Sequence, residues 1–456
     1  MRWPPQLPDE PRLVLRNVSV PACVVDVNAA FAATPDATPD ASGLIRIDML
    51  IDEGSIAAIG ASDSSGSSGS SGSFASSYRN VPAIEFDGTQ VWPCMIDMHA
   101  HLDKGHIWPR TENPDGTFGG ALASASSDRA RYWTADDLGA RMSFGLQCAH
   151  AHGTAAIRTH LDSISPQHRI SWPVFSRLRD EWRGRVELQA VSILLLEHLR
   201  GEHGVELADL IAQHRGILGA VVPQTTTLRQ DLDRAFTLAA ERGLDLDFHA
   251  DETNDPDAMA LRAIAKASLR HRFRGRVVVG HCCSLAVQSD ADVRQTLDVV
   301  AQARLAVVSL PMCNLFLQDR KAGRTPRWRG VTLLHEMRAH GIPVTIASDN
   351  CRDPFFGYGD HDMLEVFRES VRIAHLDRPI GDWPAAVTRT PADVIGLDRA
   401  GRVAVGRPAD LVLFNARGYS ELLSRPQADR IVLRAGRIVD TTPPDYRELD
   451  AVLRPR

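Results

Sequence analysis

Residues 91–103, VWPCMIDMHAHLD, are the most informative segment of the chain. An apolar run at residues 91–96 gives way here to a polar, turn-rich segment. In a β-strand, residues i and i+2 point to the same side, so His99 and His101 can both reach one metal ion from one strand end. Neutral imidazole binds zinc, iron and similar divalent metals. We therefore expect a metal site at the end of this strand.

Further apolar runs follow along the middle of the chain, and segments with helical periodicity, such as 228–242, 257–270 and 291–303, separate most of them. Eight strands that alternate with helices over about 260 residues are typical of a (β/α)8 TIM barrel, whose active site lies at the C-terminal strand ends. The predicted strands are 91–97, 154–160, 187–194, 217–222, 244–249, 277–281, 305–310 and 343–348.

Residues of the metal-ligand type stand at the C-terminal ends of these predicted strands. They come from the first, second, fifth, sixth and eighth strands, so a barrel would bring them into one cavity. Such a pattern rarely arises from chance placement of histidines. The residues are His99, His101, His160, His249, His281 and Asp349.

Both ends of the chain are rich in short β-like runs. We predict that residues 1–90 and 401–456 together form one small β-sandwich domain beside a catalytic barrel at residues 91–400. A tract of serine and glycine at about residues 61–77 cannot bury a hydrophobic face and is predicted to be a flexible surface loop.

Composition excludes several classes of function. The formal net charge of −6 gives no basic field, which argues against nucleic acid or an anionic membrane as a partner. The seven cysteines have no regular spacing, which favours reduced thiols in the cytoplasm. No apolar run approaches the length that spans a membrane.

These motifs resemble those of the amidohydrolase superfamily, and within it the cytosine deaminase type. The resemblance covers essentially the whole chain outside the tract at about residues 61–77. It implies a metal-dependent hydrolase. The matching motifs are His99-x-His101-Leu102-Asp103, Arg158-Thr159-His160, Asp247-x-His249-x-Asp251-Glu252, Pro311-x-x-Asn314-x-x-Leu317-Gln318 and Ser348-Asp349.

The resemblance implies one divalent metal ion, zinc or iron. Dinuclear members of the superfamily commonly bridge their metals with a carboxylated lysine at the fourth strand. No lysine lies between Lys104 and Lys266, so the resemblance indicates a mononuclear site. The implied ligands are His99, His101, His249 and Asp349.

The same resemblance implies catalytic roles for Glu252, His281 and Asp349. Glu252 would shuttle protons, while His281 and Asp349 would manage a metal-bound hydroxide that attacks the ring carbon. The expected reaction is hydrolysis of the exocyclic C–N bond of cytosine or a related small nitrogen heterocycle. The alternative is an amidohydrolase acting on a cyclic amide or an N-alkylamino heterocycle. A homo-oligomer is compatible with this scaffold, although no segment identifies an interface.

Substrate contacts are where the resemblance to cytosine deaminase fails. Leu195 occupies the place of the glutamine that reads the pyrimidine amide edge, which argues against cytosine itself. Gln224 could supply an amide contact or face water, and Phe355 could stack on a ring or pack within its loop. Lys104 could face the pocket or the solvent. His160 could support a metal ligand or contact the substrate.

Overall fold

The computed structural model describes residues 3–5, 7–8, 10–26, 38–62 and 77–454, so the predicted loop at about residues 61–77 lies almost wholly outside the described residues. The chain divides into two compact units. The first is assembled from residues 1–96, 150–155 and 363–443, and the second from residues 97–149, 156–362 and 444–456. The domain boundaries at residues 90 and 400 remain a prediction.

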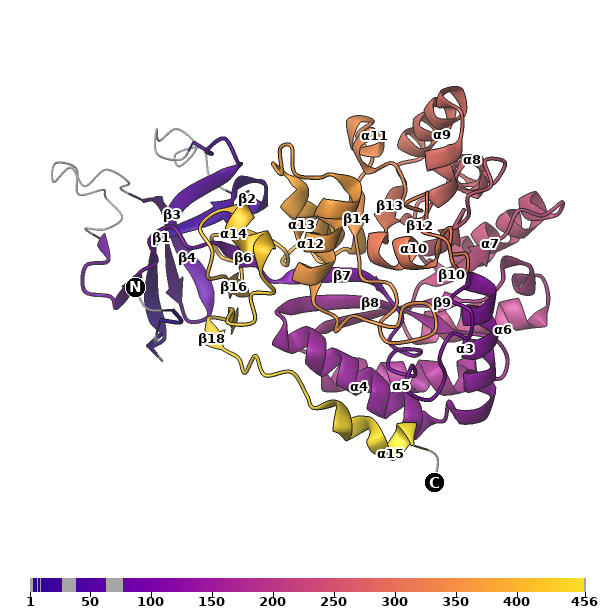
Figure 1. Ribbon diagram of the computed structural model, residues 1–456, viewed down its shortest axis with the longest axis horizontal. Coiled ribbons are helices and arrows are strands. Elements are labelled where there is room, and N and C mark those ends of the chain that lie inside the picture. Colours follow the sequence, from indigo (N-terminus) through magenta and orange to yellow (C-terminus); the bar gives the residue numbers. More distant parts are fainter. Residues whose placement is uncertain (1–2, 6, 9, 27–37, 63–76, 455–456) are drawn as a thin grey trace. The chain divides into compact units, whose positions relative to one another are not determined.

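Two four-stranded sheets form the framework of the first unit within its described residues (Figure 1). Their strands are β1 (Arg12–Pro21), β3 (Leu44–Asp52), β4 (Ser55–Ala61), β5 (Ala83–Glu85), β6 (Val91–Pro93), β16 (Leu411–Leu413), β17 (Ile431–Arg434) and β18 (Arg437–Ile438). One sheet has the order β4-β3-β1-β5, and the other has the order β18-β17-β16-β6. Neighbouring strands are antiparallel except for β1 and β5.

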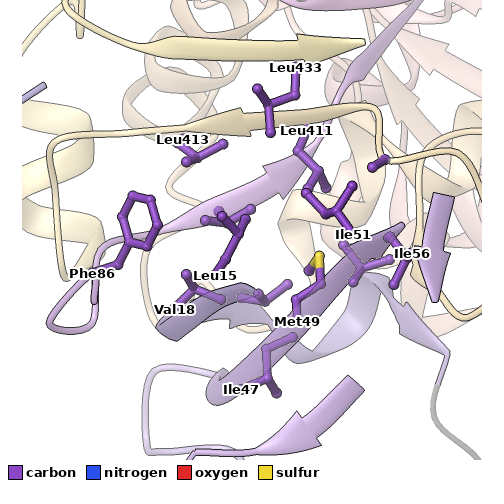
Figure 2. Close-up of a cluster of buried hydrophobic side chains, with 14 of the residues drawn as sticks. Leu15, Val18, Ile47, Met49, Ile51, Ile56, Phe86, Leu411, Leu413 and Leu433 are labelled. Carbon is purple, nitrogen blue, oxygen red and sulfur yellow. The ribbon is translucent and has the colours of Figure 1, made fainter. Parts of the chain in front are cut away.

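The core of the first unit receives side chains from both sheets. Figure 2 shows Leu15 and Met49 from the first sheet in the same cluster as Leu411 and Leu433 from the second. Alternate residues of a strand face one side of a sheet, so each strand can present an apolar face to this cluster. Segments that are far apart in the sequence are thus held together by burial of their apolar side chains.

The second unit consists of strands that alternate with helices (Figure 1). Its strands are β7 (Met95–Ala100), β8 (Thr154–Asp162), β9 (Glu187–Ile193), β10 (Leu218–Val222), β11 (Leu246–Ala250), β12 (Val277–His281), β13 (Ala306–Ser309) and β14 (Val344–Ile346). Strands β10 to β14 form a five-stranded parallel sheet, and β7, β8 and β9 form a three-stranded sheet. Isolated parallel bridges join Val191 to Ile217 and Ala100 to Asp349.

The helices between β7 and β14 follow the predicted alternation. They are α3 (Phe118–Tyr132), α4 (Ala135–Ala151), α5 (His168–Glu181), α6 (Glu202–Gln213), α7 (Leu228–Arg242), α8 (Ala260–His271), α9 (Asp290–Gln302), α10 (Pro311–Leu317) and α11 (Leu334–Ala339). Helix α7 spans the residues predicted for it, and it ends because Gly243 adopts the left-handed conformation, with φ of 64°.

Burial on both faces explains why these strands are rich in apolar residues. Every residue of β8, β11 and β12 is buried, as is usual for parallel strands that are covered on both faces. Polar residues therefore concentrate where these strands end. Among the helices in the described ranges, none combines the length and the apolar character needed to cross a membrane.

Replacement of Leu15 by alanine tests the core of the first unit. Leu15 has no exposed surface, so Leu15→Ala should lower the free energy of unfolding by about 2–5 kcal/mol. Ile438→Ala is the control, because Ile438 is 56% exposed and should change stability by less than about 0.5 kcal/mol. Calorimetric unfolding measures both. Equal effects of the two substitutions would contradict the assignment of the core.

Candidate active site

Four side chains converge at the C-terminal ends of three strands in the second unit. His99 lies on β7 and His101 directly follows it, His249 lies on β11, and Asp349 follows β14. The Nε2 atoms of His99 and His249 are 3.1 Å apart, and those of His249 and His101 are 3.3 Å apart. The Oδ1 atom of Asp349 lies 3.1 Å from His101 Nε2 and 3.6 Å from His99 Nε2.

These distances fit a shared metal ion. Ligand atoms about 2.1 Å from a tetrahedral zinc ion lie about 3.4 Å from one another. Burial lowers the pKa of His99, His101 and His249, so their rings are neutral and can offer lone pairs. Burial opposes ionisation of Asp349, but His101 and His281 outweigh it and lower the pKa of this carboxyl. The donor set therefore fits a divalent cation.

The backbone holds Asp349 in place from both sides. The Asp349 amide donates to the carbonyl of His99 at 2.8 Å, and its carbonyl accepts from the His101 amide at 3.2 Å. Asp97, buried on β7, accepts hydrogen bonds from the amide and the hydroxyl of Ser348 at 3.1 and 2.5 Å. Burial raises the pKa of Asp97 to about 6. Asp349 has a φ of 66°, a conformation that this surrounding network stabilises.

Glu252 and His281 share one hydrogen-bond donor. The Asn314 amide nitrogen donates to Glu252 Oε1 at 3.1 Å and contacts His281 Nδ1 at 3.0 Å. In this arrangement Nδ1 accepts, so the proton of the neutral His281 ring lies on Nε2. Burial, reinforced by the charge of Asp349, raises the pKa of Glu252 well above its usual value. These effects favour the protonated form of Glu252, which can donate a proton.

A cavity of about 520 Å³ opens beside this cluster. Four of the predicted substrate contacts, namely Gln224, Leu195, Phe355 and Lys104, lie on its wall with His101, His249, Glu252, His281 and Asp349. Leu195 is 42% exposed. The Lys104 ammonium is 2.7 Å from Asp162 and 3.4 Å from His101 Nδ1, so this lysine is a buried cavity residue rather than a solvated one.

The ring of His160 packs against that of His99, and His160 is not among the residues that line the cavity. Its ring centroid is 3.9 Å from that of His99, and neither ring nitrogen has a hydrogen-bond partner among the described residues. The potential ligand atoms of His160, His99 and His249 lie within 4.8 Å of one another. This position favours support of a metal ligand over contact with the substrate.

Sequence reasoning missed two parts of the site. Asn314 belongs to the motif Pro311-x-x-Asn314-x-x-Leu317-Gln318, but the sequence alone assigns it no role. It follows β13 as the other site residues follow their strands. The pairing of Asp97 with Ser348 was also missed, because it joins residues 251 positions apart. A polar residue inside an apolar run, as at Asp97, is the signal that could have revealed it.

A buried cluster of three histidines and one aspartate beside a glutamate with a raised pKa, at the carboxyl ends of strands that alternate with helices, fits the class of metal-dependent hydrolases. A family model described as "Amidohydrolase family" matches residues 145–440. The chain belongs to the amidohydrolase family and is a hydrolase that acts on C–N bonds.

Relatives cover almost the whole chain. It is 48% identical over 447 residues to the protein "Pterin deaminase" of Rhizobium rhizogenes, covering 98% of each chain. The structure resembles 5-methylcytosine deaminase from Klebsiella pneumoniae, with a TM-score of 0.75, 21% identity and coverage of 94% of this chain and 97% of the other. It also resembles N-isopropylammelide isopropylaminohydrolase from Burkholderia multivorans, with a TM-score of 0.70, 24% identity and coverage of 94% and 98%. The two structural likenesses concern the fold.

Loss of one ligand tests the metal centre. His249→Ala should lower metal affinity at this site by more than about 100-fold, since loss of outer partners alone commonly costs 10–100-fold. Elemental analysis should find one metal equivalent per chain fewer than in the wild type. His340→Ala is the control, because His340 caps α11 outside this cluster. An unchanged metal content in His249→Ala would refute the ligand set.

Proposed function

We propose that this protein is a metal-dependent deaminase that hydrolyses the exocyclic C–N bond of an aminated pteridine and releases ammonia. The observation that carries this proposal is the 48% identity to "Pterin deaminase" over 98% of both chains. The cavity of about 520 Å³ supports it, because small-ligand sites span about 300–1,000 Å³ and a two-ring heterocycle fits within that range. Leu195 also argues against a site built for cytosine.

The proposed catalytic metal is a single zinc or iron ion held by His99, His101, His249 and Asp349. When bound, a divalent ion there lowers the pKa of a water molecule toward neutrality and so supplies a nucleophile. The separation of 3.1–3.3 Å between neighbouring imidazole nitrogens supports a shared ion. His160 would support the ring of His99 from behind.

Glu252 is the proposed proton shuttle. Because its raised pKa favours the protonated form, it would pass a proton to a ring nitrogen of the substrate as the ring carbon is attacked. Its carboxylate would then take the remaining proton of the oxygen added to the ring carbon and deliver it to the departing amine as the C–N bond breaks. His281 carries its proton on Nε2 and would orient the attacking water together with Asp349. Asn314 would hold the side chains of Glu252 and His281 in fixed positions relative to each other through its contacts with both.

The proposed substrate contacts divide by chemistry. Phe355 offers a ring face for stacking, and the Lys104 ammonium lies 6.0 Å from the centre of that ring. Gln224 offers an amide to a polar edge of the heterocycle. Leu195 offers only an apolar surface, which suits a ring edge that needs no hydrogen bond there.

Two features of the architecture belong to the same proposal. The strands of the second unit would close into a (β/α)8 barrel, supported by the bridges between Val191 and Ile217 and between Ala100 and Asp349. The sheets of the first unit would form a β-sandwich, with domains at residues 1–90, 91–400 and 401–456. No disulfide joins any of the seven cysteines, all of which are described, which supports a reducing, cytoplasmic compartment.

An ammonia-release assay on metal-loaded protein tests the function. Pterin should be deaminated, and Glu252→Gln should reduce kcat by about 10²–10⁴-fold, because the proton shuttle is lost. Its metal content should stay unchanged, since Glu252 is not a ligand. Glu206→Gln, on the surface of α6, is the control and should retain full activity.

The products decide between this reaction and its alternatives. A new carboxylate without ammonia would indicate a cyclic-amide hydrolase, and release of an alkylamine would indicate an N-alkylamino-heterocycle hydrolase. No turnover of pterin, cytosine or aminotriazines by the metal-loaded wild type would overturn the deaminase proposal.

The role of Leu195 has a separate test. Leu195→Gln should raise the ratio of kcat/KM for cytosine to kcat/KM for pterin by about tenfold, because one hydrogen bond to a buried polar edge is worth about 1–3 kcal/mol. Leu122→Gln is the control, because it introduces the same side chain at another exposed leucine of the cavity wall. A ratio that is the same in both variants would exclude Leu195 from substrate selection.

A further inference from the structure

A second group of metal-ligand side chains lies in the second unit, outside the catalytic cluster. His106, Cys351 and His361 are all buried, and their potential ligand atoms lie within 4.8 Å of one another. None of them belongs to the catalytic ligand set, and none lines the cavity of about 520 Å³. A thiol and two imidazoles are the donor types that zinc prefers in structural sites.

The three residues come from loops that are already joined by their backbones. His106 follows β7, while Cys351 and His361 follow β14. The His106 amide donates to the Cys351 carbonyl at 3.1 Å, and the Trp108 amide donates to the Arg352 carbonyl at 2.9 Å. These bonds fix the distance between the two loops. The three side chains are therefore held close together before any ion binds.

The imidazole ring of His106 makes no hydrogen bond to the described residues. It is 1% exposed, yet neither of its ring nitrogens has a hydrogen-bond partner among the described residues. A buried polar group without a partner is costly and requires an explanation. Its ring centroid is 5.7 Å from that of His361, close to the 5.4 Å between the ligands His99 and His101. A shared ion would satisfy a ring nitrogen of His106.

The backbone is also held in an uncommon conformation at two of the three residues. His106 has a φ of 66° and His361 has a φ of 55°, both in the left-handed region. His281 and Asp349, in the catalytic cluster, have the same feature, with φ of 70° and 66°. Non-glycine residues in this region cluster at functional sites, where the surroundings over-determine them.

Neighbouring groups shape the rest of the cluster. Gly145 on α4 makes room for the His361 ring, because a Cβ atom at this position would lie 3.0 Å from His361 Nε2. Cys148, one turn further along α4, lies near Asp360 and Cys351, and burial together with these two groups raises the pKa of its thiol. A cavity of about 340 Å³ reaches His106 and offers a route for an ion.

We propose that His106, Cys351 and His361 bind a second divalent metal ion, with zinc favoured by the ligand types. This ion has a structural role and fixes the loops after β7 and β14. Cys351 is two residues after Asp349, and His106 is five residues after His101. The ion therefore restricts the movement of the two segments that carry these proposed catalytic ligands. The catalytic centre itself stays mononuclear.

Cobalt substitution of the full-length protein tests this site without relying on activity. Protein stripped with a chelator is titrated with Co²⁺ alone, and bound metal and the absorption spectrum are recorded. Two equivalents should bind per chain. One of them should give a near-ultraviolet thiolate-to-cobalt charge-transfer band, which the His3Asp ligand set has no sulfur to produce.

Variants assign the two equivalents. Cys351→Ser should bind one equivalent and lose the band, whereas His249→Ala should bind one equivalent and keep it. His106→Gln should also bind one equivalent and lose the band. Agreement between these two variants shows that the loss does not come from misfolding of one of them. Cys23→Ser, in the first unit, is the matched control and should bind two equivalents.

The wild-type titration alone can overturn the proposal. One equivalent per chain without the charge-transfer band would do so. A band that survives in Cys351→Ser would also do so, because the sulfur ligand would then be a different cysteine.

Discussion

The second unit must hold four electron-pair donors close together in a buried space. The rest of its structure depends on this constraint. Three imidazole nitrogens and one carboxylate oxygen gather away from solvent, with distances of 3.1 Å (His99–His249), 3.3 Å (His249–His101), 3.1 Å (His101–Asp349) and 3.6 Å (His99–Asp349). Neutral rings in such a space repel through their lone pairs unless a cation or a proton lies between them. The surrounding structure must hold them there, and it does so through the hydrogen bonds between β7 and the segment after β14 and through the Asp97–Ser348 pair.

The sequence was sufficient for the parts of the site that follow strand periodicity. His99 and His101 were predictable because alternate residues of a strand share a side, and His249 because an apolar run ended there. The shared donor Asn314 was not predictable, since its two contacts depend on the path of the chain into α10. The cluster around His106 was missed for the same reason, because its residues lie on loops without periodicity. The order of strands and helices was predictable, whereas the composition of the two compact units required long-range contacts.

The cavity wall combines ionisable and apolar side chains. Three of the proposed ligands, His101, His249 and Asp349, line it together with Glu252, and so do leucine, phenylalanine and valine side chains. Burial lowers the pKa of His249 and raises that of Glu252. A flat heterocycle bound there would meet both an apolar surface and groups that can donate a proton.

Strands β9 and β10 carry none of the proposed ligands, yet Leu195 and Gln224 follow them directly. The segments that would select the substrate are thus mostly different from those that would hold the metal, apart from the segments after β7 and β14, which also carry Lys104 and Phe355. Natural selection can therefore alter the first group without disturbing the second. A scaffold divided in this way can acquire a new substrate through few substitutions while its chemistry is inherited intact.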